Sequence, residues 1–219
     1  MTNEMPQWAS EVFSMPRLGR YIHHCGGDKA AAWRMYRWNL EVSAAFYEPL
    51  HCLEVGVRNA LNVQMLNAYG VSNWWTVAPL DAGALRLVQK AQAKLTRGRA
   101  RDGKRCVDDD LIAELTFGFW AALIATRYDR AFWIPTLRHA FPFLDESRKE
   151  LHHRLESAVL FRNRIMHYEP IFHRDLAADF RKIVRVVGYI DQDAAVALKQ
   201  ADRLSVLLAG RPSAGESRS

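Results

Sequence analysis

Residues 50–69 read LHCLEVGVRNALNVQMLNAY, and this stretch decides the fold class. Its apolar side chains recur at spacings of three and four, the period that places them on one face of an α-helix. These positions are Leu53, Val57, Ala60, Leu61 and Met65. Gly70 follows directly, and glycine commonly ends a helix. The stretch therefore predicts a long helix, closed at Gly70, with one face against a core.

The rest of the chain shows the same helical period, and no segment alternates over enough residues to predict a strand. Acidic residues before apolar runs indicate helix starts. Further helices are expected over residues 28–47, 81–96, 108–128, 145–169, 175–190 and 193–209. The sequence thus predicts an all-α protein, with residues 1–209 as a single helical domain and 210–219 as a disordered tail.

Composition sets the size of the core and the sign of the charge. The 219 residues are 49% hydrophobic, enough for one sizeable core. Lys and Arg exceed Asp and Glu by 30 to 24, which gives a net charge of +6 and a pI near 9.4. This moderate excess suits a polyanionic partner such as nucleic acid, and it equally suits simple solubility.

The cysteines and histidines give no metal or disulfide pattern. Cys25, Cys52 and Cys106 are an odd set without short spacings, which argues against a disulfide framework and a zinc site and favours a reducing compartment. The adjacent pairs His23-His24 and His152-His153 point to different helix faces and lack a second cluster at ligand spacing. We therefore expect no metal and no cofactor.

Neither end of the chain nor its apolar runs indicate a membrane. The first ten residues lack the basic and apolar regions of a secretory signal. The longest apolar run, residues 117–125, is far shorter than the roughly 20 residues that span a bilayer. A cytoplasmic location without membrane contact is expected.

Chemistry is concentrated in the hexapeptide RNRIMH, residues 162–167. Arg162 offers a permanent cation with a fork of donors that suits phosphate, and His167 exchanges protons near neutral pH. Phosphodiester cleavage needs both abilities. The other interpretation is that these cations only close a helix, because its macrodipole favours positive charge at the C-terminus.

Helix geometry separates the two side chains of this motif. Residues five apart lie about 140° apart around a straight helix, whereas Asn163 and His167, four apart, share a face. For Arg162 and His167 to touch one phosphate, the arginine must reach round, the helix must loosen, or a second copy must complete the pocket. We expect the last, a symmetric homodimer in which the motifs face each other.

A second polar cluster, Glu54, Arg58 and Asn59, lies in the helix that opened this section. Glu54 and Arg58 stand four apart in the favourable orientation, so a surface salt bridge is one interpretation. A polar triad in an apolar helix must otherwise face water or another polar group. The segment around Arg162 and Asn163 is the expected partner.

Six cations against one acid mark residues 94–105, where two glycines predict an exposed loop. The candidate RNA-binding residues there are Arg97, Arg99, Arg101, Lys104 and Arg105. They would position a phosphate backbone without reading bases, or they are simply solvated. Trp74 and Trp75 either stack unpaired bases or lie in the core. His173 is either an additional proton donor or solvent-facing.

Four blocks of this sequence resemble a known family. WNLEVSAA (38–45), LEVGVRNAL (53–61), LTFGFW (115–120) and FRNRIMH (161–167) look, in this order, like the blocks of Abi-like proteins, the abortive-infection AbiD/AbiF type of the HEPN superfamily. The resemblance implies an all-α, HEPN-like helical bundle with additional N-terminal and peripheral helices. It also implies dimerisation and metal-independent endoribonuclease activity in phage defence or a toxin–antitoxin system.

The resemblance assigns roles to residues of both polar clusters. Arg162 and His167 match the R-x4-6-H signature and Asn163 its usual polar position, while the Glu54 block matches the family's other polar helix. The implied partners are RNA, a second copy, and an antitoxin or other defence protein. Related toxins often carry an adenylylated Tyr two places after the His; here Glu169 stands there, so that regulation is not expected.

The expected reaction is transesterification by the ribose 2′-OH. One His167 accepts the 2′-OH proton, the second copy's His167 protonates the leaving 5′ oxygen, and Arg162 stabilises the phosphoryl charge. A non-catalytic helical module that binds RNA or a protein, with the cluster kept for the dimer, is the alternative.

Overall fold

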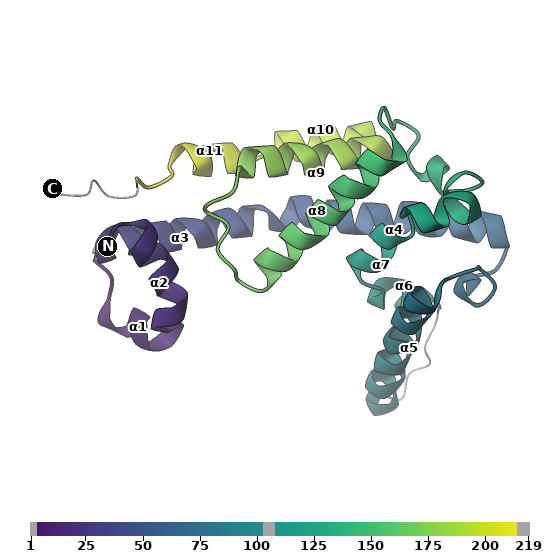
Figure 1. The fold of residues 1–219 in the computed structure, drawn as a ribbon, viewed down its shortest axis with the longest axis horizontal. Coiled ribbons are helices and arrows are strands. Elements are labelled where there is room, and N and C mark those ends of the chain that lie inside the picture. Colours follow the sequence, from purple (N-terminus) through teal and green to yellow (C-terminus); the bar gives the residue numbers. More distant parts are fainter. Residues whose placement is uncertain (1–3, 103–107, 214–219) are drawn as a thin grey trace.

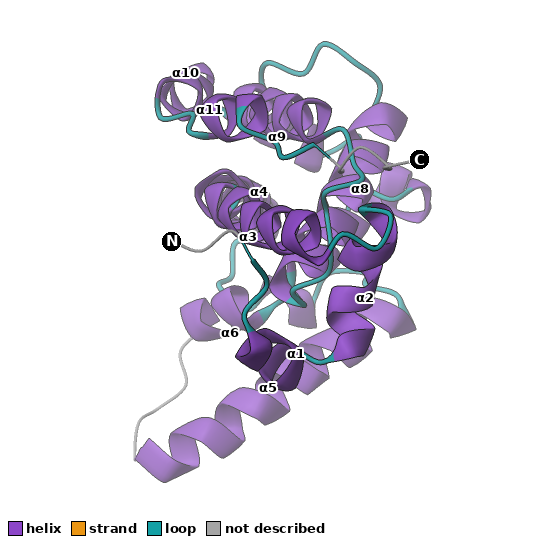
Figure 2. Ribbon diagram, turned by 90° about the vertical axis from the view of Figure 1, so that its left-hand side faces the viewer, coloured by secondary structure: helices purple, strands orange, loops and turns teal. Residues whose placement is uncertain are grey.

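The computed structural model describes residues 4–102 and 108–213, and no strand occurs among them (Figures 1 and 2). The all-α prediction is confirmed. The helices are α1 (Gln7–Phe13), α2 (Met15–His24), α3 (Lys29–Ala45), α4 (Tyr47–Tyr69), α5 (Ala82–Asp102), α6 (Asp108–Glu114), α7 (Phe117–Ala122), α8 (Arg148–Met166), α9 (Leu176–Ile190), α10 (Gln192–Gln200) and α11 (Leu204–Ala209), with short 3-10 and π turns between them.

Helices α3 and α4 follow one another almost in line and form the spine of the bundle (Figure 1). Asp28 caps α3, where its carboxylate accepts hydrogen bonds from the N–H groups of Ala30 and Ala31 at 2.8 and 3.0 Å. Helix α4 ends at Gly70 in the left-handed conformation, with φ of 68°. The expected start of one helix and end of the other are confirmed.

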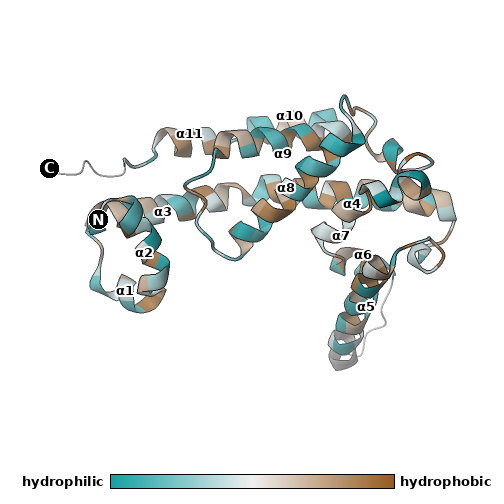
Figure 3. Cartoon of the chain, viewed as in Figure 1, coloured by the Kyte–Doolittle hydropathy of each residue, from teal (hydrophilic) through white to brown (hydrophobic). Residues whose placement is uncertain are grey.

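The apolar stripe of α4 lies in the core, as its spacing predicts. Leu53, Val57, Leu61 and Met65 are completely buried, and α9 packs along this helix. Figure 3 shows apolar and polar residues alternating along α4, α8 and α9, the pattern of helices with one buried face. Asp175 caps α9 through the N–H of Ala178 at 2.8 Å.

Two expected helices are interrupted. The helix predicted over 108–128 stops after α6, because the hydroxyl of Thr116 accepts a hydrogen bond from the N–H of Phe119 at 3.3 Å and caps a separate, short α7. The helix predicted over 193–209 is broken between α10 and α11, where Asp202 accepts from the N–H of Leu204 at 2.7 Å. The helix expected from residue 145 begins later, with Ser147 as its cap.

The expected loop at residues 97–102 is helical instead. Helix α5 continues to Asp102, since Ala, Arg, Lys and Gln favour helix and Gly98 alone does not end it. The helix projects away from the bundle (Figure 1). Lys104 and Arg105 lie outside the described residues.

The two ends of the chain differ in structure. Helices α1 and α2 pack against α3 through an aromatic cluster that includes Phe13, Trp33 and Tyr36. Residues 211–213 follow α11 without helix, and the rest of the predicted tail lies outside the described residues.

In the part of the chain that the structure covers, no helix combines the length and apolarity needed to cross a membrane.

Candidate functional site

Helix α8 carries the RNRIMH motif on its last turns. Its inner face is buried through Leu151, Leu155, Ala158, Phe161 and Ile165. The ring of Phe161 lies edge-on to that of Phe46, between α3 and α4, with centroids 4.8 Å apart. This packing fixes the rotation of α8 and therefore the direction of each motif side chain.

Arg162 points from α8 towards α4. Its Nε donates to Oε2 of Glu54 at 3.0 Å and its Nη2 to Oε1 at 3.5 Å, while Nη1 lies 3.5 Å from Oδ1 of Asn163. The expected contact between the two polar clusters is confirmed. The alternative Glu54–Arg58 salt bridge is not formed: Glu54 pairs with Arg162, and Nε of Arg58 donates to Oδ1 of Asn59 at 3.2 Å.

His167 lies on another side of α8. It occupies the C-cap, where its N–H bonds to the carbonyl of Asn163 at 2.9 Å. Its imidazole is exposed and forms no hydrogen bond or ion pair with any described residue. On a regular helix, positions 162 and 167 lie about 140° apart, and His167 stands one residue beyond the helical end of α8 at Met166. No hydrogen bond joins the Arg162 and His167 side chains within the described chain, since the bonds of Arg162 go to Glu54 and Asn163.

Five residues form a stripe along the side of α8 that faces away from the core. We call it the α8 outer face; its residues, spaced four, four, three and four apart, are His152, Glu156, Leu160, Asn163 and His167. Leu160 is 70% exposed although it is apolar. The catalytic candidates Asn163 and His167 thus share a surface with an uncovered leucine.

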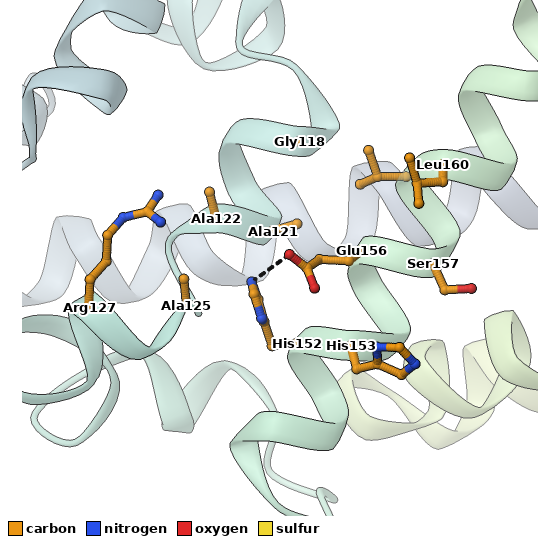
Figure 4. A pocket seen from close by; sticks show the side chains of 11 residues that line it. Gly118, Ala121, Ala122, Ala125, Arg127, His152, His153, Glu156, Ser157 and Leu160 are labelled. Carbon is orange, nitrogen blue, oxygen red and sulfur yellow. Dashed lines mark ion pairs between the residues drawn. The ribbon is translucent and has the colours of Figure 1, made fainter.

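A hollow of about 580 Å³ lies beside this face, between α7 and α8 (Figure 4). Gly118, Ala121, Ala122 and Ala125 form one wall, and their small side chains leave the space open. His152 and Glu156 stand on the other wall, with Nε2 of the histidine 3.7 Å from Oε1 of the glutamate. Sequence reasoning missed this hollow, because it depends on how two helices separated along the chain meet.

Burial lowers the pKa of His152 below its ordinary 6.5. Desolvation is the largest cause, and the nearby cations Arg148 and Arg127 act in the same direction, while Glu156 opposes them. The neutral imidazole is therefore favoured in the folded protein.

The chain reverses sharply after the motif. The N–H groups of Tyr168 and Glu169 bond back to the carbonyls of Ile165 and Arg164 at 2.9 and 2.8 Å, which is a Schellman ending. Tyr168 takes the left-handed position, with φ of 56°, where glycine is usual. Arg17 of α2 donates to its carbonyl at 3.0 Å.

Asn39 of α3 holds the loop that follows. It is 3% exposed, and its Oδ1 accepts from the N–H groups of Ile171 and Phe172 at 2.8 and 3.1 Å. A polar residue on the apolar side of the helix at 28–47 was the available signal, but no sequence argument identified its partner. Asn39 positions the end of α8 relative to the spine.

His173 lies in this same loop, exposed and near several cations. Partial burial lowers its pKa, and Arg164, Arg174 and Arg20 lower it further. Arg174 itself is held by two bonds to the buried Asp179, at 2.7 and 2.9 Å. His173 is thus solvent-facing in a basic neighbourhood, and its expected role as proton donor stays a prediction.

The other candidate RNA contacts separate into two groups. Trp74 and Trp75 are 0% and 4% exposed, and Trp74 donates to Asn62 at 2.9 Å. They belong to the core, so base stacking by this pair is excluded. Arg97 is exposed on α5, which also carries Arg99 and Arg101, whereas Lys104 and Arg105 fall outside the described residues.

Among residues 4–102 and 108–213, no three histidine, cysteine or acidic side chains gather as a metal-ligand set. No family model matches this sequence, and no curated protein or solved structure matches it either.

Proposed function

We propose that this protein is a metal-independent endoribonuclease of a phage-defence or toxin–antitoxin system, built on Arg162 and His167 in a symmetric homodimer. The observation that supports it is the state of the two side chains: the arginine is oriented by Glu54, and the histidine is exposed and unbonded within the described part of the chain. The resemblance to Abi-like HEPN proteins points the same way. RNA is the substrate class, in keeping with the net charge of +6.

The proposal includes a second copy, which would complete the pocket beside α8. On a regular helix, positions 162 and 167 lie about 140° apart, and we expect a second copy to complete a phosphate site between them. We place this contact on the α8 outer face, where the apolar Leu160 is 70% exposed beside Asn163 and His167. A twofold axis across this face gathers two copies of the motif at one interface.

The proposed reaction needs one base, one acid and one cation. His167, neutral, accepts the ribose 2′-OH proton as the 2′ oxygen attacks phosphorus. The bond from phosphorus to the 5′ oxygen breaks, and the second copy's His167 gives a proton to that oxygen. Arg162 stabilises the phosphoryl oxygens, with Asn163 beside them. The products are a 2′,3′-cyclic phosphate and a 5′-OH.

A non-catalytic module that binds RNA or protein is the second candidate. The specific observation in its favour is that Glu54 already neutralises the Arg162 guanidinium. In this reading the pair joins α4 to α8 and has no chemical role.

Cleavage without metal separates the two candidates. Purified protein is incubated with mixed RNA in EDTA, beside Arg162→Ala, His167→Ala and the matched surface variants Arg181→Ala and His139→Ala. The nuclease predicts cleavage that both motif variants lose and both controls keep, with cyclic-phosphate ends by mass spectrometry. Binding without cleavage on several RNA pools supports the module.

A further inference from the structure

Helix α5 has two opposite faces. Ala84, Val88 and Ala91 are buried, whereas Arg86, Lys90, Lys94 and Arg97 follow one another at spacings of four, four and three. This spacing keeps the four cations within an arc of about 80° on the side away from the buried residues. They form a basic ridge about 17 Å long, at 1.5 Å rise per residue.

The ridge contains uncompensated charge. Lys94 is bound to Glu114 at 2.5 Å, but Arg86, Lys90 and Arg97 make no ion pair with any residue that the structure describes. The helix holds no acid before Asp102. Since α5 projects from the bundle (Figure 1), these three cations are exposed without an acidic partner, although Nε of Arg97 donates to the carbonyl of Ala93 at 3.1 Å.

The inner end of the ridge leads towards α8. Arg86 and Lys90 border a hollow of about 410 Å³ between α5 and α7, floored by Leu87, Phe119 and Leu123. Two residues, Ala122 and Arg127, line both this hollow and the one between α7 and α8. The two hollows adjoin at these two residues and mark a path from the basic ridge to residues 152–160 of α8, before the motif.

We infer that three cations of the basic ridge of α5, Arg86, Lys90 and Arg97, bind the phosphate backbone of single-stranded RNA and direct it along this path towards α8. The inference rests on the proposed function for the identity of the polyanion. Arg86 and Lys90 are separated by about 6 Å along the helix and Lys90 and Arg97 by about 10 Å, which allows each cation to meet a different phosphate of an extended strand. Such contacts carry no base preference.

Binding is measured in the full chain with His167→Ala, so that the RNA stays intact. A fluorescent single-stranded RNA of mixed sequence is titrated from about 50 to 200 mM salt. The ridge variant is Arg86→Gln/Lys90→Gln/Arg97→Gln. Its matched control, Arg181→Gln/Lys199→Gln/Arg203→Gln, removes as many exposed cations from α9, α10 and the turn before α11.

The ridge variant is expected to bind about tenfold or more weakly at low salt, with the slope of log K against log salt reduced by about 2, since each contact to a single strand contributes about 0.7. The control should change affinity less than about twofold. Three results would overturn the inference. RNA affinity could fall equally in the ridge variant and in the control variant, or it could stay unchanged in the ridge variant. Polyglutamate could also displace the RNA at equal charge. Ridge-dependent binding without any cleavage by the unmutated chain upholds it and contradicts the proposed nuclease only.

Discussion

Arg162 of α8 and Glu54 of α4 are joined by an ion pair, with Nε 3.0 Å from Oε2, and both side chains are partly shielded from solvent. The pair links two segments 108 residues apart in the chain. It directs the guanidinium towards α4 and leaves Nη1 beside Asn163. In our account Glu54 positions Arg162 and does not touch the substrate.

The variant Glu54→Gln keeps the shape of this contact and removes its charge. Cleavage should fall about tenfold, because a guanidinium held less firmly meets the phosphate in the correct orientation less often. Stability should change by less than about 1 kcal/mol, as for other partly exposed pairs. Cleavage rates and urea unfolding measure the two effects. Glu41→Gln, exposed on α3, is the control, and equal rates for both variants would count against the positioning role.

The backbone of Tyr168 is strained in a conformation that glycine adopts without strain. Its φ of 56° costs a non-glycine residue about 1 kcal/mol, and its ring is 73% exposed, so little packing is lost on substitution. Tyr168→Gly should therefore raise the free energy of unfolding by about 0.5–1 kcal/mol.

Tyr47→Gly is the matched control, because Tyr47 is 63% exposed but lies in the first turn of a helix. Glycine there should lower the free energy of unfolding by about 0.5–1 kcal/mol. A loss of stability in Tyr168→Gly would show that the ring, and not the backbone, decides the energy at this turn.

His152 makes stability depend on pH. Its pKa is lowered in the fold by burial, so below the ordinary value of 6.5 the unfolded chain binds a proton that the folded chain does not. Stability must then fall as pH drops from 6.5 towards the lowered value. His152→Gln should lose less stability than the unmutated chain between about pH 7 and pH 5 in urea unfolding.

The lowered pKa of His173 affects both of these proteins equally and cancels in the difference. If the free energies of unfolding of the two proteins changed with pH in parallel, burial of His152 would make no contribution to the pH dependence, which would contradict the prediction.

Most helix positions follow from local chemistry that a sequence shows. Asp28, Gly70 and Asp175 each act on the backbone at the end of their own helix. The spacing of Leu53 and Val57 correctly predicted which face of α4 is buried. The helical period predicted wrong helix bounds where one side chain could take either of two structural roles. Thr116 either continues a helix or caps a new one, and tertiary packing decides between them.

The candidate site was predictable in part. A charged residue in an apolar helix needs a partner, which made the contact between Glu54 and Arg162 foreseeable. The anchoring of the loop by Asn39 was not, since its acceptor atom meets the N–H groups of residues 132 and 133 positions away. The hollow between α7 and α8 likewise depends on the angle between helices.

Leu160 tests the proposed dimer contact. It is 70% exposed on the α8 outer face, and a carboxylate there would be desolvated and opposed by its symmetry mate in the interface. Leu160→Glu should shift the protein to monomer in sedimentation velocity and reduce cleavage in parallel. Val206→Glu, at a residue 77% exposed on α11, should leave both unchanged. A dimer that survives Leu160→Glu with full cleavage would place the interface elsewhere.

The central claim is that two copies of His167 act on one phosphate. It is tested by mixing the unmutated chain with His167→Ala at a constant total concentration, allowing the subunits to exchange, and measuring the rate of RNA cleavage. If both histidines are needed, mixed dimers are inactive, and the rate follows the square of the unmutated fraction, about one quarter at equal mixing. A rate that falls in direct proportion to that fraction, or an unmutated chain that does not cleave RNA, would contradict the account.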